Sequence, residues 1–152
     1  QEASQYMNFL VRPDAEVLLR EDGYARLWKF FTSWGGAPWL TENLKARYRA
    51  LWDRSLTGGL NWYRASPLRP AREGDAGANA ITLPREMLTV DLPTLVLWAM
   101  EDTALLPELV DGLEDYVPRL TLEKVPGASH WIVHERPAFV IDRLAAFLAQ
   151  PQ

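Results

Sequence analysis

The sequence predicts an α/β fold in which a helical first half precedes a second half that alternates strand, helix, strand and helix. Three observations carry this prediction. Five of the seven tryptophans fall before residue 65, among segments with helical periodicity. A continuous apolar run at 95–100 is typical of a strand covered on both faces, as in a parallel sheet. A second strand pattern follows at 120–125, and Pro137 opens a terminal amphipathic helix.

The amino-acid composition limits the kinds of molecule that this protein is expected to bind. The chain has 152 residues, 48% hydrophobic and 24% charged, as is ordinary for one domain or most of one. A net charge of −4 without a basic stripe argues against a nucleic-acid partner. The longest apolar run is too short to span a bilayer, which argues against a membrane partner. Cysteine is absent, which excludes disulfides and thiolate sites and is compatible with a cytoplasmic location. A small-molecule substrate fits this composition best.

The first half, residues 1–80, is predicted to be helical and to end in a linker. One helix is expected after Thr41, a plausible N-cap residue. Its apolar face repeats at i, i+4, i+7 and i+8 and consists of Leu44, Tyr48, Leu51 and Trp52. Gly35–Gly36 and Gly58–Gly59 are expected to interrupt the helices. The aromatic excess indicates either packing between helices or an aromatic-lined pocket, and the sequence leaves both open.

The second half, residues 81–152, follows a linker at 66–80 that is rich in proline, glycine and small polar residues. Between its two strands a helix is expected from Pro107 to Val117, closed by Pro118. The terminal helix is expected to bury a stripe of Ile141, Leu144, Ala145 and Leu148.

This order of elements predicts that Asp102 lies beside His130. Parallel strands joined by a crossover end at the same edge of a sheet, about 4.8 Å apart when they are neighbours. Asp102 follows the first strand and His130 follows the second. A histidine oriented by a carboxylate at that edge is the arrangement of a general base.

Other interpretations of these residues stay open. Asp102 and His130 could each simply cap the segment that follows them, and Glu101 could replace Asp102 if the strand register differs by one residue. The spacing of His130 and His134 would suit a metal site only within a helical motif that the chain lacks. We therefore expect no metal site at these histidines, and we expect His134 to lie at a helix entry.

A nucleophile for such a base is not evident in the chain. A nucleophile elbow needs a small–x–nucleophile–x–small pattern after a strand. Ser129 lacks the second small residue, and no apolar strand precedes Asp75 in its glycine-rich turn. A two-stranded parallel sheet would also leave an open strand edge. We expect a further segment, a second copy of the chain or a complementing amino-terminal half to cover that edge.

Taken together, the segments LPTLVLWAMEDTALLPELVDGLEDYVPRL and GASHWIVHERPAFV resemble the carboxyl-terminal part of α/β-hydrolases. They are most similar to the branch of soluble epoxide hydrolases and haloalkane dehalogenases. The resemblance implies that the chain is the carboxyl-terminal portion of an α/β-hydrolase sheet preceded by an all-helical cap. It also implies that Asp102 and His130 are the catalytic acid and histidine, and that the nucleophile aspartate lies outside this part. The reaction that the resemblance implies requires neither a metal nor an organic cofactor.

Within that branch, two details resemble the epoxide hydrolases. LNWYRASP at 60–67 is similar to the cap motif in which a tyrosine donates to the epoxide oxygen, which implies that role for Tyr63. SQYMNFLVRPDAE is similar to the segment of the partner tyrosine, which implies Tyr6. Trp62, next to Tyr63, and Trp131, next to His130, are expected substrate contacts.

Three functions follow as hypotheses. The first is the cap and histidine-bearing part of an epoxide hydrolase that acts through a covalent aspartyl ester. The second is a non-catalytic, truncated protein that requires a partner chain. The third keeps the fold and acts on esters or haloalkanes.

Overall fold

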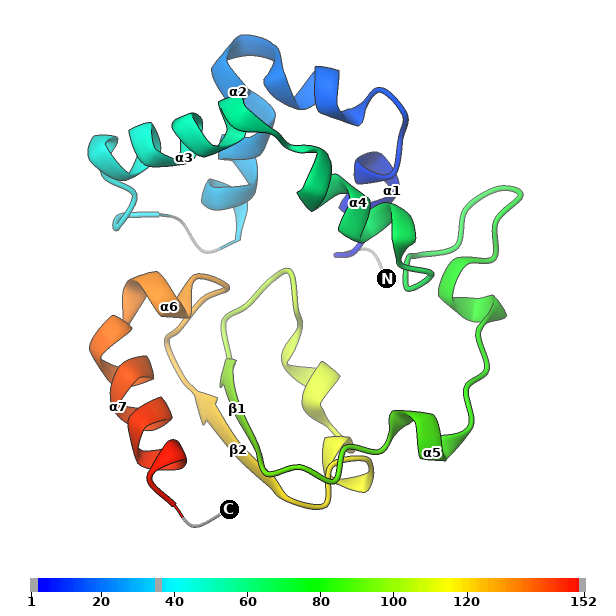
Figure 1. The fold of residues 1–152 in the computed structure, drawn as a ribbon, viewed down its shortest axis with the longest axis vertical. Helices are drawn as coiled ribbons and strands as arrows, with labels where there is room; N and C mark the ends of the chain where they lie inside the picture. The colour runs from blue at the N-terminus through cyan, green and yellow to red at the C-terminus, as the bar shows by residue number, and fades with distance from the viewer. Residues whose placement is uncertain (1–2, 35–36, 151–152) are drawn as a thin grey trace. The chain divides into compact units, whose positions relative to one another are not determined.

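The computed structural model describes residues 3–34 and 37–150, so the glycine pair expected to interrupt the helices at 35–36 lies outside the described residues. The chain divides into two compact units, Gln1–Thr82 and Leu83–Gln152, which we call the helical unit and the strand unit and describe separately (Figure 1). The helical unit contains α1 (Tyr6–Leu10), α2 (Ala15–Ser33), α3 (Glu42–Arg54), α4 (Thr57–Ala65) and the 3₁₀ turn η1 (Gly77–Ala80). The strand unit contains α5 (Arg85–Leu88), β1 (Thr94–Ala99), the 3₁₀ turns η2 (Pro107–Val110) and η3 (Leu113–Asp115), β2 (Leu120–Val125), α6 (Ile132–Glu135) and α7 (Pro137–Leu148).

Stacked aromatic rings form the centre of the helical unit. The ring of Trp52 on α3 lies 4.5 Å from that of Trp28 and 5.9 Å from that of Phe31, both on α2. Tyr48, one turn before Trp52, stacks on it at 5.5 Å. The helix at Thr41 is confirmed, because the Thr41 side chain accepts a hydrogen bond from the Leu44 amide at 3.3 Å. Ring packing between helices therefore accounts for much of the aromatic excess.

Helix α2 contains a break that its sequence pattern did not indicate. The backbone leaves helical geometry at Glu21–Tyr24, and Asp22, Gly23 and Tyr24 have φ angles of +50°, +63° and +70°. Such angles are uncommon for a residue as bulky as tyrosine. The buried Tyr24 hydroxyl donates to the Asp53 carboxylate on α3, and this contact holds the last residue of the break against the neighbouring helix.

The linker at 66–80 is a hydrogen-bonded turn. The Asp75 carboxylate accepts from the Arg69 guanidinium at 2.8 Å and from the Gly77 amide at 2.9 Å. Gly77 has a φ of +55°, and a Cβ added there would lie 2.3 Å from the Arg69 carbonyl oxygen. The turn therefore requires glycine at this position.

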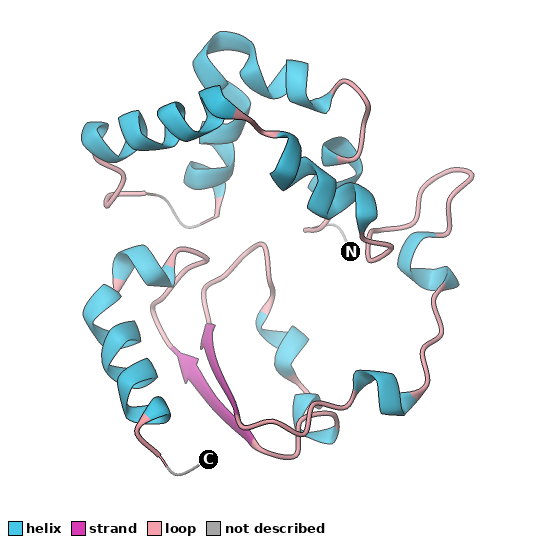
Figure 2. Ribbon diagram, in the orientation of Figure 1, coloured by secondary structure: helices cyan, strands magenta, loops and turns pink. Residues whose placement is uncertain are grey.

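The strand unit is built on the predicted parallel pair. Among the described residues, β1 and β2 form a two-stranded parallel sheet in register from Thr94↔Leu120 to Ala99↔Val125. Helix α7 and the turn η2 both contact β1, and they lie on opposite sides of the strands in Figures 1 and 2. The buried residues Ala99, Val125 and Ala128, with Ile132 and Phe139 packed against them, form the core at the carboxyl ends of the strands.

Three expectations for this unit are wrong. The helix expected from Pro107 to Val117 is two short 3₁₀ turns, because Gly112 between them has a φ of +77°. The α7 stripe of Ile141, Leu144, Ala145 and Leu148 is exposed; Phe139, Val140 and Phe147 are the partly buried apolar residues of α7. The run Thr94–Trp98 is half-buried and is not covered completely on both faces.

Among the described residues, none of the helices combines the length and the apolar character needed to cross a bilayer.

Candidate active site

Asp102 and His130 meet at the carboxyl ends of the two parallel strands, as the order of elements predicted. The His130 Nδ1 atom lies 2.9 Å from Asp102 Oδ2. The backbone continues the strand pairing beyond its last register pair, because the Met100 amide donates to Val125 and the Glu101 amide donates to Ala128, at 3.1 and 2.9 Å. These bonds keep the two segments side by side up to the residues that carry the acid and the imidazole.

Hydrogen bonds from the backbone fix the Asp102 carboxylate. Its Oδ1 atom accepts from the amides of Ala104 and Leu105 at 2.8 and 2.9 Å, while Oδ2 faces His130. Its side chain is 8% exposed and that of His130 is 25% exposed. Asp102 thus caps the following turn and also orients the histidine, so both interpretations of this residue apply at once. Glu101, the alternative acid, is exposed.

The loop that carries His130 is braced from the helices that follow it. The Glu135 carboxylate accepts from the Ser129 amide at 2.9 Å and from the Ser129 hydroxyl at 2.5 Å. The Arg136 guanidinium donates to the Gly127 carbonyl at 2.8 Å. The Ser129 hydroxyl therefore serves as a structural hydrogen-bond donor within the loop. Sequence reasoning did not assign a role to Glu135 or Arg136, although their position directly before Pro137 is a signal for a helix entry.

A small cavity lies beside the acid–histidine pair within the strand unit. It has a volume of about 150 Å³, and its walls include both Asp102 and His130 together with Trp98 and Leu105. The ring of Trp131 packs edge-on against His130 at 5.0 Å but does not line this cavity. His134 lies on α6. In the part of the chain that the structure describes, no group of three or more His, Asp or Glu side chains could hold a metal ion.

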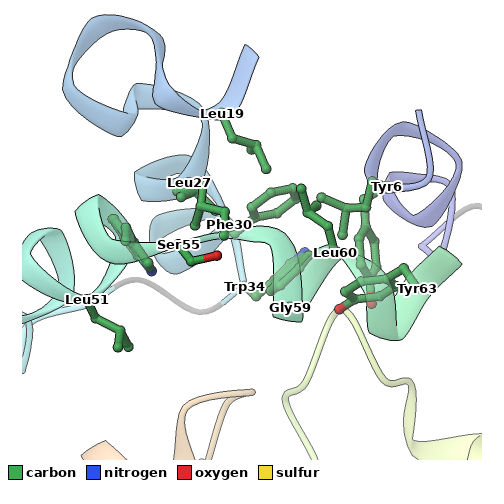
Figure 3. A pocket seen from close by; sticks show the side chains of 13 residues that line it. Tyr6, Leu19, Leu27, Phe30, Trp34, Leu51, Ser55, Gly59, Leu60 and Tyr63 are labelled. Atoms are coloured by element: carbon green, nitrogen blue, oxygen red, sulfur yellow. The ribbon is translucent and has the colours of Figure 1, made fainter. Parts of the chain in front are cut away.

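The helical unit brings the two predicted tyrosines together. The Tyr6 and Tyr63 rings lie 6.1 Å apart at 79° and line one cavity of about 420 Å³. Figure 3 shows both hydroxyl groups pointing toward the same side of that cavity. Trp62, predicted as a substrate contact, is 77% exposed and does not line the cavity. The structure therefore places Tyr6 and Tyr63 on one cavity and Trp62 outside its lining.

Known proteins resemble this chain along nearly its whole length. No family model matches it. Over 148 residues, or 95% of the chain, it is 32% identical to the AB hydrolase superfamily protein YfhM of Bacillus subtilis (strain 168) and covers 48% of that protein. It is 30% identical to Epoxide hydrolase srdG of Neurospora crassa over 118 residues, 76% of this chain and 33% of that protein.

Solved structures agree with these relatives. A crystal structure of a Bacillus megaterium epoxide hydrolase in complex with an inhibitor superposes with a TM-score of 0.79 and 26% identity, over 99% of this chain and 52% of that one. An epoxide hydrolase from metagenomes of hot environments gives a TM-score of 0.76 and 31% identity, over 99% and 51% of the two chains. The chain belongs to the α/β-hydrolase superfamily. It spans about half or less of the length of the curated relatives it matches, and it corresponds to the carboxyl-terminal portion of this fold.

Proposed function

We propose that this α/β-hydrolase chain is the lid and the histidine-bearing part of an epoxide hydrolase. The observation that carries the proposal is the 2.9 Å contact between His130 Nδ1 and the buried Asp102 carboxylate at the carboxyl ends of parallel strands. The epoxide hydrolases among the similar proteins support the same reaction class. The nucleophile is an aspartate that lies outside the residues described above.

In the first half of the proposed reaction, that aspartate opens the epoxide. Its carboxylate attacks a ring carbon, a carbon–oxygen bond of the ring breaks, and an ester forms. The departing oxygen takes a proton from a tyrosine hydroxyl. Tyr6 and Tyr63 suit this step because phenols donate hydrogen bonds without carrying charge at neutral pH, and their rings line the same cavity.

In the second half, His130 activates water. With Nδ1 engaged by Asp102, Nε2 is the nitrogen that accepts a proton from water as the water attacks the ester carbonyl. The 150 Å³ cavity beside the pair is large enough to hold water, which occupies about 30 Å³ in the liquid. The imidazolium then gives the proton taken from water to the departing alkoxide, which yields the diol and leaves the nucleophile as a carboxylic acid. The proton of this acid returns to the tyrosine phenolate formed in the first half, which restores both the carboxylate and the phenol.

The substrate class can be tested with Tyr63→Phe and Tyr6→Phe in the enzyme that contains these residues. We expect each variant to lose epoxide hydrolysis by about 10²–10⁴-fold, the usual range for a positioned proton donor. Hydrolysis of a carboxylic ester of similar size should change little, because an ester does not require protonation by these phenols. A matched control is Tyr116→Phe, in the strand unit. An equal loss on both substrates, or none on the epoxide, would contradict the proposal.

A second proposal concerns a partner. The exposed apolar stripe on α7, which includes Ile141, Leu144 and Leu148, and the half-buried strand β1 favour a further chain segment that extends the sheet. A second copy of the chain or a complementing amino-terminal half would meet this need. Light scattering on the purified 152-residue chain tests the first possibility, because a monomer at micromolar concentration would exclude self-pairing.

A further inference from the structure

The cavity of the helical unit has a consistently uncharged wall. Its thirteen lining residues are aliphatic, aromatic, glycine or serine, and they include no acid, no base and no amide side chain. Leu19 and Leu27 on α2 and Leu60 on α4 are among its apolar lining residues (Figure 3). A charged ligand group would lose its hydration here without gaining a counter-charge, and this transfer is costly. The wall chemistry therefore selects an uncharged, apolar group.

The size of the cavity sets the scale of that group. A volume of about 420 Å³ lies within the range of about 300–1,000 Å³ that is usual for small-molecule sites. An apolar cavity of about 150 Å³ already holds one benzene ring in a well-studied protein. The cavity of the helical unit thus has room for a substituent larger than a single aromatic ring.

Gly59 keeps this space open from helix α4. It lines the cavity, and a Cβ added to it would meet no atom within 4 Å. Its φ lies outside the left-handed region, so a larger residue could be placed there without backbone strain. The adjacent Gly58 is equally unobstructed but does not line the cavity. The space beside Gly59 is therefore empty, and a side chain introduced at this position would extend into it.

We propose that this cavity binds an uncharged, apolar substituent of the substrate, of about two aromatic rings, and that Gly59 sets the upper limit of its size. The assignment of this group to an epoxide substrate rests on the function proposed above. The tyrosine hydroxyls, which lie on one side of the cavity in Figure 3, would then face the reacting oxygen while the apolar group occupies the space lined by the leucines.

The test measures binding without chemistry. Calorimetric titration of the 152-residue chain with biphenyl-4-methanol, and separately with biphenyl-4-carboxylate, compares an uncharged and a charged probe of the same shape. We expect the wild-type chain to bind the alcohol at least tenfold more tightly than the carboxylate. Gly59→Leu should weaken binding of the alcohol at least tenfold and Gly59→Ala by less, whereas Gly58→Leu should leave it unchanged.

Two results would overturn the inference. One is that Gly59→Leu and Gly58→Leu bind the alcohol equally well. The other is that the wild-type chain binds the carboxylate as tightly as the alcohol, or binds neither. Because no epoxide is involved, this test is separate from that of the proposed function. Binding as expected, with no epoxide hydrolysis by the enzyme, would overturn only the proposed function; hydrolysis without binding would overturn only this inference.

Discussion

Different interactions stabilise two regions of the chain, the loop that carries His130 and the helical unit. In the loop, hydrogen bonds between residues six to nine positions apart, from Glu135 to Ser129 and from Arg136 to Gly127, fix the backbone around the imidazole. In the helical unit, aromatic rings from α2 and α3 stack on Trp52. The loop is thus organised by directional polar contacts, which define the position of a reacting atom closely. The helical unit is organised by apolar packing, which leaves a cavity.

This difference matches the two chemical tasks proposed for them. Water activation requires a ring nitrogen held in one orientation, and charge-assisted hydrogen bonds provide that. Binding of an apolar substituent requires a concave site from which water is excluded, and packed aromatic rings and leucines provide such a site. Substitutions in each region should therefore fail in different ways.

The largest expected effect is that of Asp102→Asn on turnover. The asparagine oxygen can still accept from the amides of Ala104 and Leu105, so the turn should persist. Its amide nitrogen would face His130 Nδ1 and favour the wrong tautomer. We expect hydrolysis to fall by about 10²–10⁴-fold with an unchanged thermal midpoint. Glu101→Gln is the control, and a comparable loss in that variant would contradict the assignment.

Trp52→Ala should damage the helical unit most. The side chain is buried among the rings of α2 and α3, and truncation of a buried tryptophan typically costs about 3–5 kcal/mol in the free energy of unfolding. Urea denaturation followed by tryptophan fluorescence measures the loss. Trp62→Ala, at an exposed site, should change stability by less than about 0.5 kcal/mol. Similar effects of the two substitutions would mean that ring packing does not hold this unit.

Glu135→Gln tests the polar brace of the loop. Removal of the carboxylate weakens two hydrogen bonds to Ser129, and hydrogen bonds to charged groups contribute about 1.5–3 kcal/mol. We expect faster hydrogen exchange at the Ser129 amide and a correspondingly lower stability of the strand unit. Glu114→Gln, at an exposed position, is the matched control. Unchanged hydrogen exchange at the Ser129 amide would show that Glu135 does not stabilise this loop.

The smallest effect concerns alkaline pH in the helical unit. The hydrogen bond to Asp53 raises the pKa of Tyr24 above its ordinary value of 10.0, with burial acting in the same direction. The folded state therefore favours the protonated phenol. Its contribution to stability is complete below pH 10 and is lost as the pH rises through the folded-state pKa. Urea midpoints between pH 8 and 12 should fall more steeply for the wild-type chain than for Tyr24→Phe.

The acid–histidine pair could be predicted because topology dictates it. Parallel strands that end together leave little freedom for Asp102 and His130, so the pattern of the strands was sufficient. The break in α2 and the 3₁₀ turns around Gly112 depend on single residues with positive φ, and hydrophobic periodicity does not report these. The position of β1 and β2 followed from their apolar patterns, whereas the degree of their burial did not.

The remaining features depend on contacts that the sequence order does not reveal. Rings separated by more than twenty residues stack around Trp52, and the cavity beside Tyr6 and Tyr63 is the space that such packing leaves. The stripe on α7 was expected to be buried because amphipathic periodicity identifies an apolar face but not what covers it.

The most direct test of the account is intact-protein mass spectrometry of the His130→Ala enzyme after it is mixed with an epoxide. If His130 and Asp102 activate the water that hydrolyses the ester, the protein mass should increase by the mass of the substrate and the adduct should persist. Full turnover by this variant, or the absence of any adduct, would contradict the account.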